Sequence, residues 1–177
     1  MSSLDQAVDR VIAGDIAAFG EIVSVTSDRL VRLGARMLGS LADAEDVVQE
    51  AYMSAFEALS SGRFDRRASV ETWLGRIVTN RAIDVLRRRT RRRSVSDEAI
   101  DPGFDGVASA EARIALAEIE NWLGALPPEQ RAAMTLKALE GRSSSEVAYM
   151  LNCSEGAVEQ LLVRARVTLR KLGAGGA

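Results

Sequence analysis

The sequence predicts an all-α protein made of two small helical domains, and three observations lead to this prediction. Apolar residues recur at three- and four-residue intervals along most of the chain, which is the spacing of one buried helix face. No segment alternates apolar and polar residues between turn signals, so no β-sheet is expected. The apolar fraction is 47% but aromatic residues make up only 5%, which suits thin cores of Ala, Leu, Val and Ile.

Four helices are expected in the first half of the chain. The first begins behind Ser3, the second after Asp15, the third behind Ser40 and the fourth near Ser69. Serine is a common N-cap residue because its hydroxyl accepts a hydrogen bond from an otherwise unpaired backbone amide.

Residues 94–109 separate these helices from the rest of the chain. Their sequence, SVSDEAIDPGFDGVAS, lacks a helical period and is rich in the Asp, Ser, Pro and Gly residues typical of a linker. A chain of 177 residues is long enough for two small domains. We therefore expect one domain over residues 1–93, a flexible acidic linker over 94–109 and a second domain over 110–177.

The second domain is expected to contain one helix over residues 110–125 and another from Pro127-Pro128 to Gly141. It ends in a predicted helix-turn-helix. The segment from Ser143 to Glu146 has the pattern of a capping box, and Asn152-Cys153-Ser154 forms a three-residue turn before the last helix. Val158 supplies an apolar plug between the two helices. Such a motif places its second helix in the DNA major groove. An ordinary helical hairpin has the same spacing, so both interpretations stay open at this point.

The formal net charge of −2 conceals a zoning of charge along the chain. Residues 1–62 are acidic, whereas residues 63–93 hold 11 arginines and 3 acidic residues. Arginine forks match phosphate geometry, and asparagine can pair with a base edge. A solvated basic face, or a partner for the acidic segment, would give the same pattern. The polar stripe of this basic segment recurs at helical spacing and consists of Arg76, Asn80, Asp84, Arg87 and Arg91.

Composition excludes several other classes of site. The absence of histidine excludes His-based acid–base chemistry and removes the commonest metal ligand. A lone cysteine, Cys153, excludes an intramolecular disulfide, and its place in a turn favours a packing role over redox sensing. We expect no metal, no cofactor and no enzymatic activity. The segment MSSLDQAVDR does not resemble a signal peptide, and no apolar run reaches the ~20 residues of a membrane span. A cytoplasmic protein without membrane insertion is expected.

Three segments together resemble the extracytoplasmic-function (ECF) branch of the sigma-70 family of RNA polymerase specificity subunits. The segment Asp43–Tyr52 is similar to the polymerase-binding motif of that family. The segment Thr72–Ile77, followed by Asn80 and Asp84, resembles its helix for the −10 promoter element. Its −35 domain is matched by LPPEQR at 126–131, EGRS at 140–143, EVA at 146–148 and RAR at 164–166. Order and spacing agree over residues 10–172.

The resemblance implies that the third helix binds RNA polymerase core. The expected contacts are to the clamp helices of the largest subunit, through Asp43, Glu45, Asp46, Gln49 and Glu50. A solvated face whose N-terminal acids are favoured by the helix dipole is the alternative. That alternative accounts for the first three acidic residues but not for Gln49 and Glu50.

The resemblance also implies that the fourth helix and the loop before it melt the −10 element. Asn80 would hydrogen-bond a flipped base in a pocket walled by Phe64 and the loop Asp65–Ala68, and arginines would hold phosphates. Trp73 lies on the apolar face and is expected in the core. The residues implied for −10 DNA are Phe64, Asp65, Arg66, Arg67, Arg76, Asn80, Arg81, Arg87 and Arg88.

The second domain is implied to read the −35 element and to contact the polymerase flap. Glu159 and Leu161 stand where the family commonly has basic residues, so an unusual or weak −35 readout is expected. The residues implied for −35 DNA are Arg142, Ser154, Glu155, Glu159, Gln160, Arg164 and Arg166.

The function that follows from the resemblance is promoter recognition and melting on behalf of RNA polymerase core, with an anti-sigma factor as a further partner. Little promoter binding is expected from the free protein. Two other classes stay open: a stand-alone helix-turn-helix regulator, which has no use for the Asp43–Tyr52 motif, and a serine recombinase, which needs an α/β catalytic half.

Overall fold

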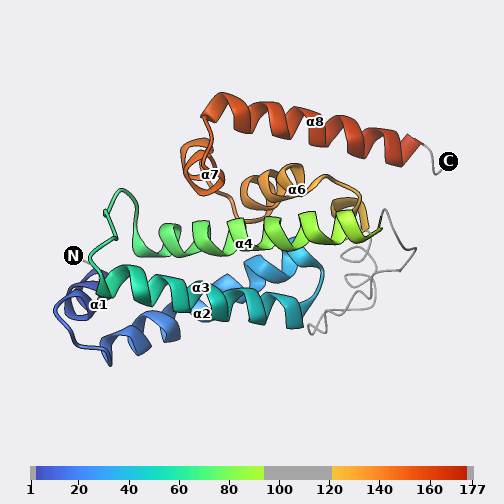
Figure 1. The fold of residues 1–177 in the computed structure, drawn as a ribbon. Helices are drawn as coiled ribbons and strands as arrows, with labels where there is room; N and C mark the ends of the chain where they lie inside the picture. The colour runs from blue at the N-terminus through green and yellow to red at the C-terminus, as the bar shows by residue number, and fades with distance from the viewer. Residues whose placement is uncertain (1–2, 94–120, 175–177) are drawn as a thin grey trace, which may run out of the picture.

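The computed structural model describes residues 3–93 and 121–174, and every element in these ranges is a helix (Figure 1). This confirms the predicted fold class. Residues 121–124 are also helical, while the rest of the helix expected over 110–125 and the expected linker lie outside the described residues. The elements of the first half are α1 (Ser3–Ile12), α2 (Ala18–Leu38), α3 (Leu41–Ser60) and α4 (Val70–Arg93). Those of the second half are α6 (Pro128–Met134), η1 (Thr135–Leu139), α7 (Ser144–Leu151) and α8 (Glu155–Ala174).

Two helix starts of the N-terminal half, residues 3–93, follow the predicted capping, whereas α1 includes Ser3 itself and α2 begins behind Ala17 without a side-chain cap. The Ser40 hydroxyl accepts from the Asp43 backbone amide at 3.2 Å, and the Ser69 hydroxyl accepts from the Thr72 amide at 3.2 Å. Helix α2 ends at Gly39, whose left-handed backbone (φ 66°) lets its amide donate to the Ala35 carbonyl. A side chain with a β-carbon adopts this conformation reluctantly, so glycine is the natural residue there.

The C-terminal half, residues 121–174, contains the predicted helix-turn-helix. Ser143 and Glu146 form a reciprocal capping box at the start of α7. Asn152 takes the left-handed conformation in the turn (φ 53°, ψ 48°), and Ser154 accepts from the Ala157 amide at 3.2 Å to begin α8. Val158 is fully buried between the two helices. These details confirm the motif at the level of single residues.

One element was not predicted. The sequence predicts a single helix from Pro127-Pro128 to Gly141, but the α-helical part ends at Met134 and continues as a π-helical turn. The Glu140 amide donates to the Thr135 carbonyl, five residues back, at 3.0 Å. Neither proline nor glycine interrupts this segment, so no sequence signal marks the wider turn.

The two halves pack against each other through α4. Figure 1 shows α4 running between α2 and α3 on one side and α6 and α7 on the other, and α4 contacts all four helices. A single cluster of buried apolar residues includes side chains from both halves, among them Leu74 and Val78 of α4 and Met150 of α7. The polar stripe therefore lies on a helix that is enclosed from both sides.

Candidate nucleic-acid interface

The polar stripe of α4 faces the C-terminal half. The Asn80 side-chain amide donates to the Arg76 carbonyl at 2.9 Å and to the Met150 carbonyl of α7 at 3.4 Å. One turn earlier, the Arg76 guanidinium lies 4.9 Å from the centre of the Tyr149 ring and donates to the Asn152 side chain at 3.4 Å. The stripe residues are thus held by the last residues of α7 and by the turn of the helix-turn-helix.

Further along α4, Arg87 makes a second link to the C-terminal half. Its guanidinium lies 2.6 Å from the Glu129 carboxylate of α6 and 3.5 Å from Asp84 on its own helix. A cavity of about 250 Å³ opens between these contacts and is lined by Asn80, Asp84 and Cys153, among others. Burial raises the pKa of the Cys153 thiol, which lowers the fraction of reactive thiolate at neutral pH.

Two other arginines of α4 point to α3. Arg81 lies 2.6 Å from the Glu50 carboxylate and donates to the Ser54 hydroxyl at 2.6 Å. Arg89 pairs with Asp43 and donates to the Leu38 carbonyl at 2.8 Å. Two acidic residues expected to bind polymerase are therefore paired with arginines of the basic helix. Sequence reasoning assigned Arg88 and missed Arg89, because nothing in the run of three arginines shows which one faces α3.

The loop before α4 differs from the expected base pocket in one respect. Phe64 is only 8% exposed and packs against Trp73 at a centroid distance of 4.7 Å, so its ring offers little surface to a base. Trp73 packs on the core, as expected. Arg66, in contrast, is exposed, has a positive φ of 55° and pairs with Asp9 of α1. Such backbone conformations are rare outside glycine and cluster at functional loops.

The outer face of α3 is exposed and acidic. Glu45, Asp46, Gln49 and Glu50 all lie on the surface, and Met53, one turn further on, is 64% exposed. A large apolar side chain beside acidic ones combines the two features of a protein-binding surface. Met53 was not singled out from the sequence, because a methionine at helical spacing looks like a core residue until the helix phase is known.

The residues expected to read −35 DNA lie on the surface, with one exception. Glu155, Glu159, Gln160, Arg164 and Arg166 of α8 are exposed, and Ser154 caps the helix.

The exception is Arg142, whose side chain is 14% exposed and is held 2.7 Å from the Glu146 carboxylate. The backbone amide of Ser143, followed by Arg142, lowers the pKa of Glu146. Arg142 thus supports the capping box.

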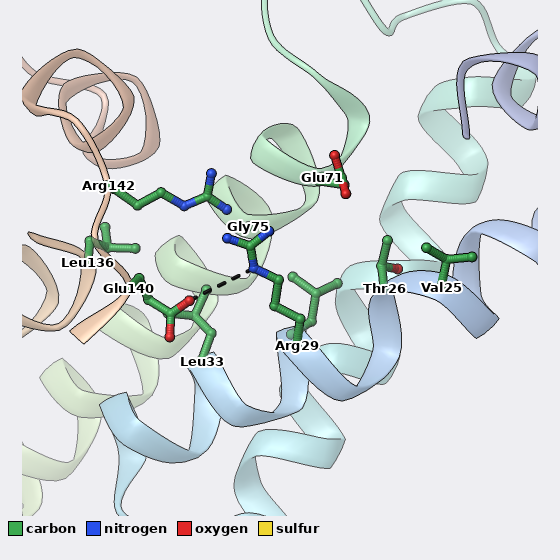
Figure 2. A pocket seen from close by; sticks show the side chains of 10 residues that line it. Val25, Thr26, Arg29, Leu33, Glu71, Gly75, Leu136, Glu140 and Arg142 are labelled. Atoms are coloured by element: carbon green, nitrogen blue, oxygen red, sulfur yellow. Dashed lines mark ion pairs between the residues drawn. The ribbon is translucent and has the colours of Figure 1, made fainter. Parts of the chain in front are cut away.

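A second pocket lies where η1 meets α2 and α4 (Figure 2). Figure 2 shows Arg29 of α2 and Glu140 on opposite sides of this pocket, joined by an ion pair of 3.9 Å. Glu140 also pairs with Arg36 and has a side chain that is only 9% exposed. No sequence reasoning identified these residues, because more than 100 positions separate Glu140 from its partners.

Within residues 3–93 and 121–174, no group of three or more His, Cys, Asp or Glu side chains could hold a metal ion. In the same ranges no helix is both long and apolar enough to cross a lipid bilayer.

Comparison with known proteins places this geometry in a family. Residues 22–92 match the family model of sigma-70 region 2, and residues 116–169 match that of sigma-70 region 4. The chain is 36% identical to the ECF RNA polymerase sigma factor SigM of Mycobacterium tuberculosis over 161 residues, which cover 91% of this chain and 80% of SigM. It is 33% identical to the ECF RNA polymerase sigma factor SigW of Bacillus subtilis over 177 residues, covering 93% of each chain. The chain belongs to the ECF sigma factor family.

Membership in the ECF sigma factors settles the fold and the functional class. A solved structure of CnrH in complex with the cytosolic domain of CnrY is 27% identical to this chain, has a TM-score of 0.70, and covers 99% of this chain and 100% of CnrH. The chain acts with RNA polymerase in promoter-directed initiation rather than as a stand-alone regulator. The region 2 match spans α2, α3 and α4, and so includes both the acidic face and the polar stripe of this sigma factor.

Proposed function

We propose that this sigma factor binds RNA polymerase core through the exposed face of α3 and opens promoter DNA with α4 and the loop before it. The observation that carries the proposal is that α3 and α4 share one core, yet present charges of opposite sign to the outside. The acidic face lies on α3, and the arginines lie on α4. One compact unit can therefore bind a basic protein surface and a DNA strand at the same time.

Core binding is assigned to Glu45, Asp46, Gln49 and Glu50, with Asp43 at the edge of the surface. Carboxylates facing basic clamp helices speed association and fix the register of docking more than they add affinity. Met53 supplies an apolar contact at the C-terminal end of this surface. Because Asp43 and Glu50 are paired with Arg89 and Arg81, part of the acidic charge is neutralised before the polymerase arrives.

Promoter opening is assigned to Asn80 and the surrounding arginines, together with the exposed loop residues Asp65, Arg66 and Arg67. Extruding a base from the duplex costs a few kcal/mol. Stacking of an unpaired base contributes about 1–3 kcal/mol, and charged contacts to phosphates add to it. Preferential binding of the opened strand can therefore offset the cost of melting without ATP. Asn80 can pair with a base edge, and Arg76, Arg81, Arg87 and Arg88 would hold phosphates.

The remaining assignments follow from the helix-turn-helix and the family. We place the −10 unit in residues 1–93, the linker in 94–109 and the −35 unit in 110–177, with α8 in the major groove and a contact to the polymerase flap. Glu159 can accept a hydrogen bond from a cytosine amino group but repels phosphate, so the −35 readout is weak or unusual. CnrH was solved with a cytosolic protein domain bound, and we infer an anti-sigma partner for this chain. It acts in the cytoplasm and catalyses no reaction itself.

Run-off transcription with purified bacterial core polymerase over a promoter library tests the proposal. The expected result is specific transcripts that depend on this chain. A variant with Glu45, Asp46 and Glu50 changed to Ala should lose at least tenfold in core affinity, with a flatter dependence on salt.

Asp28→Ala, which removes an exposed acidic residue of α2, is the control and should change neither quantity. Absence of any complex with core polymerase would overturn the proposal.

A further inference from the structure

Part of the face of α4 that is assigned to the −10 element contacts the C-terminal half. Arg76 contacts Tyr149 and Asn152, Asn80 donates to the Met150 carbonyl, and Arg87 pairs with Glu129. The Asn80 amide nitrogen has two N–H donors, and both are directed at backbone carbonyls. A base edge would need those donors, so DNA and the C-terminal half compete for the same atoms.

A glycine on α4 makes the close approach possible. Met150 is fully buried, and a β-carbon built at Gly75 would lie 2.8 Å from the Met150 terminal methyl carbon. The other atom within 4 Å of that position is the Met150 sulfur, so no side chain of the N-terminal half occupies the space. Gly75 is therefore needed for docking of α7 and not for packing of α4 onto α2 and α3.

Charges hold the same interface together at its other edge. Glu140 pairs with Arg29 and Arg36 of α2 from a nearly buried position. Arg131 of α6 is 4% exposed and donates to the Arg36 carbonyl near the C-terminal end of α2. A helix C-terminus carries partial negative charge, which favours a guanidinium there. These partners come from the two halves, so the pairs exist only while the halves are docked.

We propose that this docked arrangement is a self-inhibited state, in which the C-terminal half occupies the −10 DNA site of α4 and must move away before a strand can bind. The inference rests on the proposed function of α4 and specifies its regulation. The exposed residues of α8 are not covered, so inhibition is selective for the −10 site. If one molecule in a hundred is open, the apparent affinity for single-stranded DNA falls about a hundredfold.

Variants of the interface test this in the full-length protein, with a fluorescein-labelled pool of 12-nucleotide single strands of random sequence as the probe. Gly75→Leu places four carbons against Met150 and should raise affinity for the probe at least tenfold. Gly75→Ala meets only the flexible end of Met150 and should raise it much less.

Reversing the charge of Glu140 opens the other edge of the interface. Glu140→Arg should also raise affinity at least tenfold, because it faces Arg29 and Arg36. Asp28→Arg makes the same change in net charge on an exposed position of α2 for which the described residues offer no ion pair, and it should have a small effect. Combining Arg36→Glu with Glu140→Arg restores opposite charges and the original net charge, so affinity should return toward the unmodified level.

Two further measurements separate folding from inhibition. Circular dichroism should be unchanged in every variant. Binding to core polymerase should be retained or become tighter, since none of the variants alters the face of α3 and core binds the separated form. The rate of Cys153 alkylation at neutral pH should rise in Gly75→Leu and Glu140→Arg, because the thiol lines the interface.

If core binding is retained while probe affinity and alkylation stay at the unmodified level in both variants, the self-inhibited state is refuted and the proposed function stands. If the unmodified chain binds no core polymerase, the proposed function fails instead.

Discussion

The two DNA-binding surfaces of this sigma factor differ in how accessible they are. Three residues of the polar stripe of α4, Arg76, Asn80 and Arg87, are bonded to the C-terminal half, and Arg76 and Asn80 are partly buried there. The outer face of α8 is exposed over most of its length. Duplex readout by α8 needs only an exposed surface. Binding of a single strand by α4 needs hydrogen-bond donors that are bonded to the C-terminal half in the free protein. Accessibility, rather than residue type, separates the two surfaces in the free protein.

Preventing the halves from separating should give the largest difference between the two DNA-binding surfaces. Asp84 and the native Cys153 line one cavity, so Asp84→Cys supplies a second thiol across the interface. Bridging the two thiols with a short bifunctional reagent should lower affinity for single-stranded DNA about a hundredfold and leave duplex −35 binding unchanged. The same variant without reagent is the control, and equal loss at both sites would show that the bridge merely distorts the protein.

A substitution of Asn80 tests whether α4 recognises the base sequence of the −10 element. Asn80→Ala should remove discrimination at one −10 position, worth about 1–3 kcal/mol, because a bidentate pair to one base edge is lost. Binding of promoters that differ at each −10 position measures this. Uniform weakening across all of them would make Asn80 a positioning residue only.

Arg87 and Arg88 are neighbours in the chain, but only Arg87 pairs with a residue of the C-terminal half. Arg88 is exposed, so Arg88→Ala should weaken binding for every promoter and reduce the salt slope by about one unit. Arg87 also holds Glu129 of α6. Arg87→Ala should therefore lose the same phosphate contact but loosen the docked state, leaving a smaller net loss in the free protein. DNA titrations at several salt concentrations distinguish the two variants. Identical binding curves would show that Arg87 has no role in holding the inhibited state.

The smallest effect concerns the capping box at the start of α7. The pKa of Glu146 is lowered in the folded state, chiefly by the Ser143 amide. A carboxylate with a lowered pKa stabilises the fold at pH above its unfolded pKa of ~4.3, and this stabilisation is lost as the pH falls through the folded pKa. Glu146→Ala should cost about 1 kcal/mol at pH 7 and less at pH 3, because it removes the carboxylate that accepts from the Ser143 amide. Urea unfolding at both pH values measures this cost. An equal cost at both pH values would show that the charge of Glu146 does not contribute to the stability of the cap.

Local features of the fold followed from the sequence because their causes are local. The Ser40 cap, the Ser143–Glu146 capping box, the left-handed Asn152 and the buried Val158 each depend on a few neighbouring residues. Helix α2 shows the limit of propensity, because Gly20 and Ser24 are weak helix formers and yet tertiary packing keeps the helix continuous.

The site was less predictable where it depends on long-range packing. The sequence identified the polar stripe but could not show that Arg76 and Asn80 are partly buried under α7 or that Arg87 pairs with Glu129. The pairing of Glu140 with Arg36 joins residues far apart in the chain, and the π-helical turn before Glu140 has no local signal. The burial of Phe64 against Trp73 depends on how the loop folds back onto α4.

Single-molecule energy transfer between the two halves measures whether they separate. Donor and acceptor dyes on Ser24→Cys of α2 and Lys171→Cys of α8, in a Cys153→Ser background, report their separation. One population is expected in the free protein, with the separation of the docked halves, and it should shift to a longer distance when core polymerase is added. A free protein that already has the longer separation, or a docked separation that persists in the polymerase complex, would contradict the self-inhibited state.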